Sequence, residues 1–490
     1  MSTHLLGLDI GSSSIKAALV DADSGRVIAA AQSPATEMKI LASRVAWAEQ
    51  DPEQWWQHVC HAAAELRTKQ PAAWQNVAAI GISYQMHGLV LTDSDQRPVR
   101  PSIIWCDSRA VEIGDQAFAD LGRDYCLSHL LNSPGNFTAS KLAWVKRNEP
   151  DVLSRAQYMM LPGDYIALKL TGEASTTAAG LSEGMLWDFK SNQTAQAVLE
   201  HYELNSDLIP PLVPIVGEQG VLCSAAAKEL ELSDGVMVSY RAGDQPNNAM
   251  SLACLKPGEV AATAGTSGVV YAVSDQLVAD AESRVNTFMH VNGDTASRTG
   301  VLLCINGAGA LYRWVRELLD ETSYDALNAL ARDIDPGACG LLFSPYGNGA
   351  ERSLSNASPG AGLSGLQVNT HGKGHFVRSA LEGICFAFKL GVDLLQELEV
   401  PTSVVRAGRS NMFQSELFSE VFASVVDSEV VLYETDGAAG AARAAGVGIG
   451  TYQTLEEALS TLQAVQTISP HREWQEQYCE IYHEWRSRLR

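Results

Sequence analysis

The chain has 490 residues, which is longer than one hydrophobic core usually supports, so we expect two or three domains. Its apolar content of 46% is that of a globular protein, and its net charge of −22 argues against a general nucleic-acid-binding surface. The sequence contains no run of about 18 apolar residues, which argues against a membrane span.

The first predicted element is a β-hairpin over residues 5–21, in which two apolar runs flank a turn of small residues. The backbone N–H groups and hydroxyls of such a turn suit phosphate oxygens. The turn residues are Gly11, Ser12 and Ser13. Asp9 ends the first strand, where a carboxylate can hold a hydrated magnesium ion, and Lys16 follows the turn. Taken alone, the stretch also fits an ordinary hairpin with a polar tip.

A third strand over residues 26–32 and a helix over residues 52–69 follow the hairpin. Asp51 is suited to be the N-cap of this helix, and Pro52 to be its first residue. The opening therefore predicts a three-stranded meander followed by a helix.

Polar side chains follow two predicted strands, one over residues 77–83 and one over residues 101–109, which we expect to pair with residues 89–92. These side chains are Met86, His87, Trp105, Asp107 and Arg109. Because α/β proteins bind ligands at strand ends, the pattern predicts the walls of a polar pocket. The alternative is that His87 is structural and that Arg109 pairs with Asp107 in a solvated loop.

Residues 111–205 are mostly helical in pattern, and we expect them to form a cap or insertion around the pocket. A new apolar strand over residues 236–240 then leads into Gly243, Asp244 and Gln245. A turn that places an acidic residue between a strand and a helix resembles a catalytic turn. Gly243 has no side chain, so another group can approach the backbone closely there. An N-cap role for Asp244 is the alternative.

Residues 259–273 repeat the opening pattern of an apolar strand, a small polar turn and a second apolar strand. The second turn consists of Gly265, Thr266 and Ser267. Two equivalent hairpins in one chain predict two domains of related design that face one another. Such an arrangement is suited to holding a polyphosphate from both sides.

Later segments add candidate contacts to a nucleotide. Gly309 lies at the start of a predicted helix, and residues 404–411 form a strand followed by a tight turn. A turn of this kind, with Gly408, Arg409 and Asn411, lets a flat base or a ribose lie against the backbone. Residues 436–446 form a helix of small residues, for which tight packing is the favoured interpretation.

Several common motifs are absent from the sequence. It contains no Gly-x-x-x-x-Gly-Lys-Ser/Thr loop, no dinucleotide fingerprint after the first strand and no His-Glu-x-x-His. The nine cysteines are scattered without a Cys-x-x-Cys pair, so neither a disulfide scaffold nor a structural zinc site is expected. With no signal-like segment before the first strand, we expect a cytoplasmic protein.

Taken together, these motifs resemble the FGGY family of carbohydrate kinases, within the actin/hexokinase/Hsp70-like fold group, over nearly the whole chain. The segments that carry the resemblance are residues 85–88, 101–109, 137–145 with Lys141, 243–245, 362–366 and 375–382. The resemblance implies an α/β fold of two ribonuclease H-like domains with a ligand cleft between them. We place the N-terminal domain at residues 1–242 and the C-terminal domain at residues 243–490.

The resemblance also implies an ATP- and Mg²⁺-dependent sugar kinase with Asp244 as the general base. It is strongest to members that phosphorylate the 5-hydroxyl of D-xylulose to give D-xylulose 5-phosphate. The implied sugar-binding residues are Met86, His87, Trp105, Asp244 and Gln245. The implied nucleotide-binding residues are Gly11, Ser12, Ser13, Lys16, Gly265, Thr266, Ser267, Gly309, Gly408, Arg409 and Asn411, with Asp9 holding the metal ion. The expected partners are a small sugar and ATP, with no nucleic acid and no membrane, and the family suggests a homodimer.

Two alternatives stay open at this point. Instead of a D-xylulose kinase, the chain could be a kinase for another sugar or polyol, such as ribulose, gluconate or glycerol, or a non-catalytic nucleotide-binding protein of the same fold. Among the positions that depart from the family pattern, two matter for the site. Tyr84 stands where a small residue is usual and is expected to narrow the sugar pocket. Arg409 stands where Gly is usual and is expected to stack on the base or obstruct it.

Overall fold

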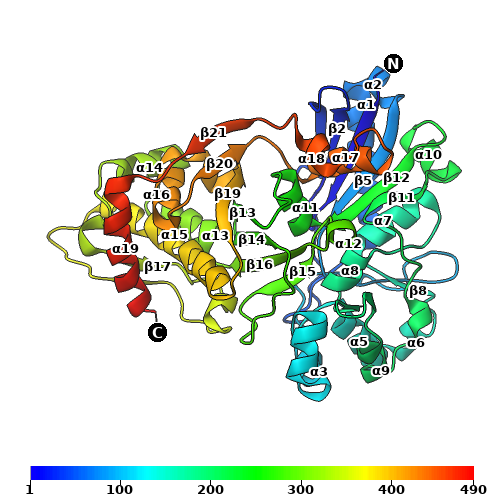
Figure 1. Cartoon of the computed structure of the whole chain (residues 1–490), viewed down its shortest axis with the longest axis horizontal. Helices are drawn as coiled ribbons and strands as arrows, with labels where there is room; N and C mark the ends of the chain where they lie inside the picture. Colours follow the sequence, from blue (N-terminus) through cyan, green and yellow to red (C-terminus); the bar gives the residue numbers. More distant parts are fainter. Residues whose placement is uncertain (1, 490) are drawn as a thin grey trace.

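Two mixed β-sheets organise the chain in the computed structural model, which describes residues 2–489 (Figure 1). The first sheet contains β1 (His4–Ile10), β2 (Ile15–Asp21), β3 (Val27–Ser33), β5 (Val77–Tyr84), β11 (Val216–Val221) and β12 (Met237–Gly243). The second contains β13 (Gly258–Ala264), β14 (Gly268–Ser274), β15 (Asn286–Met289), β16 (Thr299–Ile305), β19 (Thr402–Gly408), β20 (Val430–Tyr433) and β21 (Ala464–Ile468).

The two sheets repeat one topology. The first has the order β3-β2-β1-β5-β12-β11, and the second contains the order β16-β14-β13-β19-β20-β21. In both, two antiparallel pairings are followed by two parallel ones and a final antiparallel one. The predicted duplication is therefore confirmed, and the two small polar turns occupy equivalent places between β1 and β2 and between β13 and β14.

The strand register brings the predicted chemistry to one edge of the first sheet. Asp9 lies opposite Lys16 on β2 and beside Ser83 on β5. The last residues of β1, β5 and β12 are in register with one another, since Tyr84 pairs with both Ile10 and Gly243. The segments that follow these parallel strands therefore leave the sheet together.

Helices cover both sheets. In the first half they are α1 (Pro52–Lys69), α2 (Pro71–Trp74), α3 (Val111–Leu121), α4 (Arg123–Tyr125), α5 (Thr138–Asn148), α6 (Pro150–Leu153), α7 (Pro162–Thr171), α8 (Ala178–Glu183), α9 (Gln196–His201) and α10 (Ser224–Leu230). The predicted helix 52–69 is confirmed, and the Asp51 side chain caps it by accepting a hydrogen bond from the Glu53 N–H. The region 111–205 is mostly helical, as expected.

In the second half the helices are α11 (Asp244–Ser251), α12 (Gly293–Ala296), α13 (Ala308–Leu318), α14 (Tyr324–Arg332), α15 (Lys373–Glu397), α16 (Glu416–Val426), α17 (Gly437–Gly448), α18 (Leu455–Leu459) and α19 (Arg472–Ser487). Short strand pairs complete the fold: β4 (Glu49–Gln50) with β7 (Ser102–Ile103), β6 (Val90–Thr92) with β8 (Tyr158–Met160), β9 (Trp187–Asp188) with β10 (Gln193–Thr194), and β17 (Leu342–Ser344) with β18 (Gly362–Ser364). The predicted pairing of residues 89–92 with 101–109 is reduced to a bridge between Leu89 and Ile103.

The small-residue helix α17 joins the two halves. Although it comes late in the sequence, it packs on the first sheet, where Figure 1 shows it beside the blue strands. A Cβ at Gly7 would collide with the Ala438 carbonyl, and one at Gly81 with the Ala441 carbonyl. The favoured interpretation of this helix as a tightly packed element is therefore confirmed.

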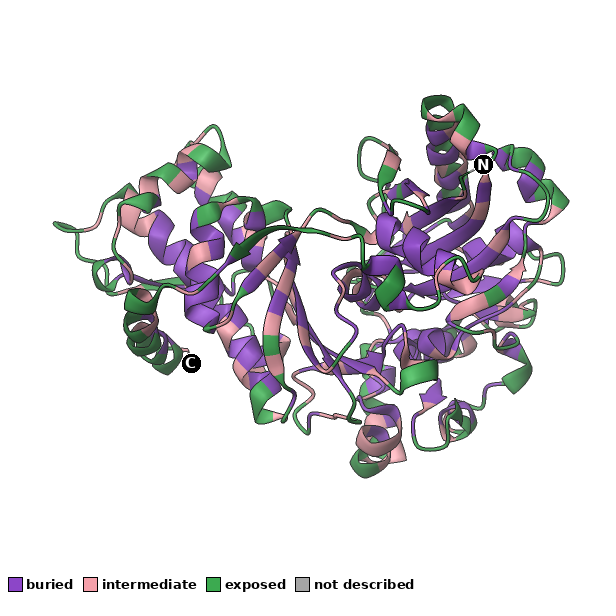
Figure 2. Cartoon of the chain, turned by 45° about the horizontal axis from the view of Figure 1, so that its top comes forward, coloured by how far each residue is buried: buried purple, intermediate pink, exposed green. Residues whose placement is uncertain are grey.

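The strands of both sheets and many of the helices that cover them consist largely of buried residues, coloured purple in Figure 2. Separate apolar clusters lie on the two faces of the first sheet, and another surrounds α15 and α16 beside the second sheet. Within residues 2–489, no helix has both the length and the apolar character needed to cross a membrane.

Candidate functional site: two adjoining cavities

Two cavities open near the polar turns. The first, here called the C-terminal cavity, has a volume of about 410 Å³ and is lined only by residues between 264 and 418. The second, the shared cavity, has a volume of about 450 Å³ and is lined from both halves of the chain. The shared cavity is lined by Met86, His87, Trp105, Asn136, Phe137, Asp244, Gln245, Ser267, Val269, Asn286, Leu302, Cys304, Asn306 and Arg352.

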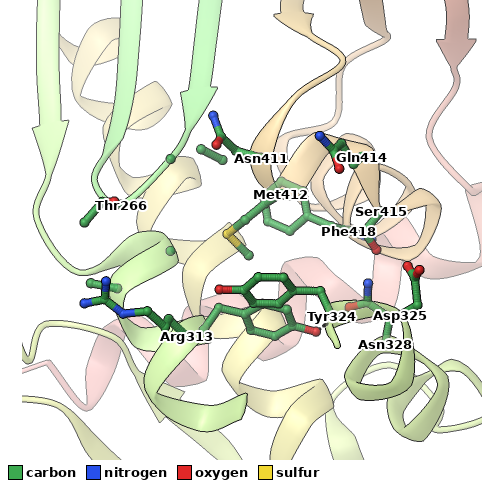
Figure 3. A pocket seen from close by; sticks show the side chains of 15 residues that line it. Thr266, Arg313, Tyr324, Asp325, Asn328, Asn411, Met412, Gln414, Ser415 and Phe418 are labelled. Atoms are coloured by element: carbon green, nitrogen blue, oxygen red, sulfur yellow. Dashed lines mark hydrogen bonds between the residues drawn. The ribbon is translucent and has the colours of Figure 1, made fainter. Parts of the chain in front are cut away.

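The C-terminal cavity has an aromatic wall. Tyr312 on α13 and Tyr324 on α14 are stacked, with ring centroids 6.0 Å apart and planes 9° from parallel. The Tyr312 hydroxyl donates a hydrogen bond to Asn328 Oδ1 at 2.5 Å. Figure 3 shows Thr266 and Arg313 at one end of this cavity and Asp325 at the other. Such a cavity offers a flat apolar surface, polar groups at one end and a polar turn at the other.

The second polar turn separates the two cavities. Gly265 and Thr266 line the C-terminal cavity, whereas Ser267 lines the shared one. The start of α13 fixes this turn, because Gly309 N–H donates to Gly265 O at 2.9 Å and Ala310 N–H donates to Thr266 O at 3.0 Å. A side chain at Gly309 would collide with the Gly265 carbonyl. The turn is thus a rigid partition with one cavity on each side.

Asp244 is the first residue of α11 and lies in the shared cavity next to Gln245. Gly243 has to be small, because a Cβ there would lie 2.6 Å from both Met86 Cγ and Glu183 Oε2. Burial, followed by the negative charge of Asp9, raises the pKa of Asp244 to about 7. A carboxyl group with this pKa exchanges protons readily near neutral pH, as a general base requires.

The His87 ring is held in one tautomer. Its Nδ1 lies 2.9 Å from the Glu183 carbonyl oxygen, which can only accept, so Nδ1 carries the proton and Nε2 is an acceptor. Removal from water, followed by the charge of Lys141, lowers the pKa of His87 to about 3. His87 therefore presents a neutral ring to the shared cavity, packed edge-on against Phe137 with centroids 4.7 Å apart.

The first polar turn lies beside the shared cavity without lining either cavity. The Trp105 indole N–H donates to Ser12 Oγ at 3.2 Å, which connects this turn to a side chain of the shared cavity. Gly11 and Ser13 complete the turn, and Lys16 is exposed on β2 opposite Asp9.

Asp9 has the chemistry of a magnesium ligand. Ser83 Oγ donates to Asp9 Oδ1 at 2.8 Å, and burial is the main cause of the raised pKa of this carboxyl group. No cluster of three or more His, Cys, Asp or Glu side chains suited to a metal ion occurs within residues 2–489. Mg²⁺ usually binds proteins through one or two carboxylates, with water and substrate phosphates as its other ligands, so the residues present fit it.

Two predicted pocket residues pair with each other instead. Arg109 contacts Asp107 through Nη2 and Oδ2 at 2.7 Å, and both side chains are buried. Arg109 also stacks on Trp47, with its guanidinium carbon 3.7 Å from the ring centroid. Of the two predicted strand ends, Met86, His87 and Trp105 reach the cavity. Asp107 and Arg109 form the pair that the alternative interpretation expected, but the pair is buried and not in a solvated loop.

The expectation that Tyr84 narrows the pocket is wrong. Strand alternation points Ser83 toward Asp9, so Tyr84 points to the opposite face of β5. There its buried ring lies over Gly163 of α7, where a Cβ would collide with it. Gly408 and Arg409 lie outside the lining of the C-terminal cavity, whereas Asn411 is part of it, so nucleotide contacts by the first two stay predictions.

Several lining residues carry no signal in the sequence. Asn286 and Arg352 line the shared cavity and bond to each other, the guanidinium donating to Asn286 Oδ1. Asn306 lines it too, and its N–H donates to Glu351 Oε1 at 2.9 Å. The only available sign was the glycine-rich stretch before Arg352, which marks a loop but gives it no role.

Comparison with known proteins identifies the class to which the chain belongs. Residues 4–251 match the N-terminal domain, and residues 260–449 the C-terminal domain, of the FGGY family of carbohydrate kinases. The chain belongs to this family. It is an enzyme that transfers phosphate from ATP to an alcohol group, and its two-domain α/β fold is the one the sequence predicted.

Within the family the chain is similar to xylulose kinases. It is 30% identical to the xylulose kinase of Escherichia coli over 470 residues, which cover 95% of this chain and 94% of the relative. Its fold matches the xyloylose kinase of Brucella ovis with a TM-score of 0.90 at 27% identity, covering 99% and 98% of the two chains. The gluconate kinase of Lactobacillus acidophilus has a TM-score of 0.90 at 21% identity, covering 99% and 97%, so it shares the fold.

Proposed function

We propose that this chain transfers the γ-phosphate of ATP to the 5-hydroxyl of D-xylulose, giving D-xylulose 5-phosphate and ADP. The observation that carries the proposal is the turn at residues 265–267, which borders both cavities, with Asp244 in the shared one. A donor in one cavity and an acceptor in the other would meet at this turn. The similarity to xylulose kinases supports the choice of sugar.

ATP is assigned to the C-terminal cavity. The tyrosine wall suits a purine ring, and Asp325 and Asn328 offer hydrogen-bonding groups beside it. The phosphates would extend toward Thr266 and Arg313 at the other end (Figure 3). Gly11, Ser12, Ser13 and Lys16 would meet them from the first half of the chain.

Asp244 is assigned as the general base. Its carboxylate accepts the proton of the sugar 5-hydroxyl as the hydroxyl oxygen bonds to the γ-phosphorus and the bond from that phosphorus to ADP breaks. Phosphoryl transfer mostly needs alignment and charge neutralisation, and base assistance adds about 10²–10⁴-fold. The pKa of about 7 supports this role, because the residue is largely ionised in slightly alkaline solution.

Mg²⁺ is assigned to Asp9, whose partly buried carboxylate and Ser83 partner would hold the ion or its water shell. When bound, the ion neutralises phosphate charge. The remaining assignments concern the sugar. His87 Nε2 would accept a hydrogen bond from a sugar hydroxyl, and Met86, Trp105 and Gln245 would enclose the ring or chain.

We also propose the division into residues 1–242 and 243–490. The first sheet, formed by strands within residues 4–243, and the second, within residues 258–468, support a boundary close to this position, although the last residue of β12, Gly243, belongs to the first sheet. Helix α17 belongs to the second part by sequence and packs on the first. The cytoplasmic location, the homodimer and the absence of a nucleic-acid partner stay predictions.

A second candidate is phosphorylation of a sugar acid such as gluconate. One observation favours it, the Arg352 guanidinium in the wall of the shared cavity, since Arg binds carboxylates well. Arg352 is already bonded to Asn286, and for this reason we rank the sugar acid second.

A substrate panel tests both candidates. ADP release is measured with D-xylulose, D-ribulose, D-gluconate and glycerol, each with ATP and Mg²⁺, and kcat/KM is compared. We expect D-xylulose to have the highest value. A higher value for gluconate would favour the second candidate, and no sugar-dependent ADP release would overturn the kinase assignment.

A further inference from the structure

Lys141 is a buried lysine that the site described above does not use. It belongs to α5, its side chain is 0% exposed, and it lies outside the lining of both cavities. Its ammonium donates to the His87 carbonyl oxygen at 2.8 Å and to the Ile104 carbonyl oxygen at 3.1 Å. A buried ammonium group is costly unless its bonds do something for the fold or the site.

The two carbonyls belong to two walls of the shared cavity. His87 is itself a lining residue, and Ile104 directly precedes the lining residue Trp105. The segments pair through main-chain hydrogen bonds between Leu89 and Ile103, with distances of 2.9 and 3.2 Å. Within residues 2–489 no strand pairing continues beyond this bridge toward the cavity. Lys141 joins the two segments there, at His87, two residues before Leu89, and at Ile104, one residue after Ile103.

The His87 backbone needs such support. His87 has a φ of 61°, which is the left-handed region that a non-glycine residue adopts only when its surroundings hold it there. Its ring is fixed from the other side by the Glu183 carbonyl. With Lys141 bonded to its main chain and Glu183 to its ring, both the place and the tautomer of His87 are defined.

We propose that Lys141 is a positioning residue for sugar binding: by tying the His87 turn to the Trp105 segment, it sets the spacing of two walls of the shared cavity. It touches neither substrate. The inference rests on the proposed binding of sugar in the shared cavity. It goes beyond that proposal, because it makes the affinity for sugar, and not that for ATP, depend on a residue that does not line the cavity.

The test is the variant Lys141→Met, which keeps an apolar stem and removes the donors. Its matched control is Lys146→Met, on the same helix, where Lys146 is partly exposed and bonds to Glu203. Steady-state KM values for sugar and ATP are measured, together with the rise in melting temperature that each ligand produces separately.

For Lys141→Met we expect a sugar KM about 10–100-fold higher, since displacing positioning groups slightly has effects of this size. The ATP KM should stay within about twofold, because the C-terminal cavity does not contact α5.

The split between the two ligands separates positioning from general stability. A variant that is merely less stable would melt earlier yet keep both KM values and both ligand-induced shifts, and that result would overturn the inference. Equal losses for sugar and ATP would overturn it too. If Lys141→Met does not fold, the same measurements are made on Lys141→Leu, which also removes the donors, with the same criterion.

The wild-type protein keeps the two proposals apart. The comparison uses whichever sugar of the panel the wild type phosphorylates best. If that sugar is not D-xylulose, the proposed substrate is wrong, whereas the Lys141 comparison is still decided by the ratio of sugar KM to ATP KM in Lys141→Met and Lys146→Met.

Discussion

The two cavities differ in how they are built. The C-terminal cavity is made wholly by residues of the second half, around the rigid turn that α13 holds in place. The shared cavity takes Met86, His87 and Trp105 from one half and Asn286, Asn306 and Arg352 from the other. A change in the angle between the halves would therefore reshape the shared cavity and leave the C-terminal one intact. If ATP and the sugar bind as proposed, this difference teaches that domain closure can control the sugar cavity while the ATP cavity stays preformed.

The two polar turns show the same asymmetry. The second turn lines both cavities, whereas the first lines neither and is joined to the shared cavity by the Trp105–Ser12 hydrogen bond. Sequence repetition made them look equivalent, and their topology is equivalent. Their surroundings are not, because only the second turn is followed by a cavity with an aromatic wall.

The largest expected effect comes from Asp244→Asn. The amide keeps the size of the side chain and cannot accept the proton, so turnover should fall by about 10²–10⁴-fold. ATP binding should be little changed, since Asp244 lines the shared cavity only. Coupled ADP detection measures the first effect, and titration with an ATP analogue the second. Near-normal turnover would remove Asp244 from the base role, and loss of ATP binding would break the distinction between the cavities.

Tyr84→Ala tests where the shared cavity ends. Because the ring is buried against α7, its removal should destabilise the fold by about 3–5 kcal/mol, as for other large aromatic truncations. The sugar KM should stay within about twofold. Urea unfolding and steady-state kinetics give the two quantities, with Tyr84→Phe as the control that keeps the ring. A marked gain of activity on larger sugars would show that Tyr84 does bound the cavity.

Tyr324→Ala tests the C-terminal cavity alone. Loss of an aromatic surface for a base is worth about 1–3 kcal/mol, so the ATP KM should rise by about tenfold or more, with the sugar KM unchanged. Trp314→Ala on the neighbouring helix α13 is a matched control, because Trp314 is half-exposed and outside the lining. A parallel rise of the sugar KM would mean that the two cavities are coupled more tightly than their linings indicate.

The fold could be predicted where its signals are local. Two apolar runs around a small polar turn marked both hairpins, and Asp51-Pro52 marked the start of α1. The position of Asp244 between a strand and a helix was also evident. Such signals are carried by consecutive residues, so one sequence is enough to read them.

The cavity linings could not be predicted in the same way. Asn286 and Arg352 meet through the folding of β15 and a loop far along the chain, and no pattern in either segment marks the contact. In the sequence, nothing distinguishes Tyr312 and Tyr324 from other helix residues. They form one aromatic surface only because α13 and α14 bring their rings together. The direction of Tyr84 follows from strand alternation only once Ser83 is known to face Asp9, and that contact comes from the structure.

The smallest expected effect is a change in the free energy of unfolding. It tests whether the ionised Asp244 carboxylate destabilises the folded protein before any ligand binds. The pKa of Asp244 is about 7 in the folded protein, above its ordinary value of 3.8. The folded state therefore binds this proton more tightly than the unfolded state, and the stability it provides is present at low pH and lost as the pH rises from about 4 to 7. Asn cannot ionise, so Asp244→Asn should gain stability relative to wild type across that window, by about 1–2 kcal/mol at pH 8 for a partly exposed group.

Urea unfolding at pH 4.5 and pH 8, with EDTA and without nucleotide, measures the difference. Asp115→Asn, at an exposed position on α3, is the control. An equal effect of Asp244→Asn at both pH values would mean that ionised Asp244 does not destabilise the ligand-free protein. The shared cavity would then carry no electrostatic cost of this kind, and in this respect the two cavities would not differ.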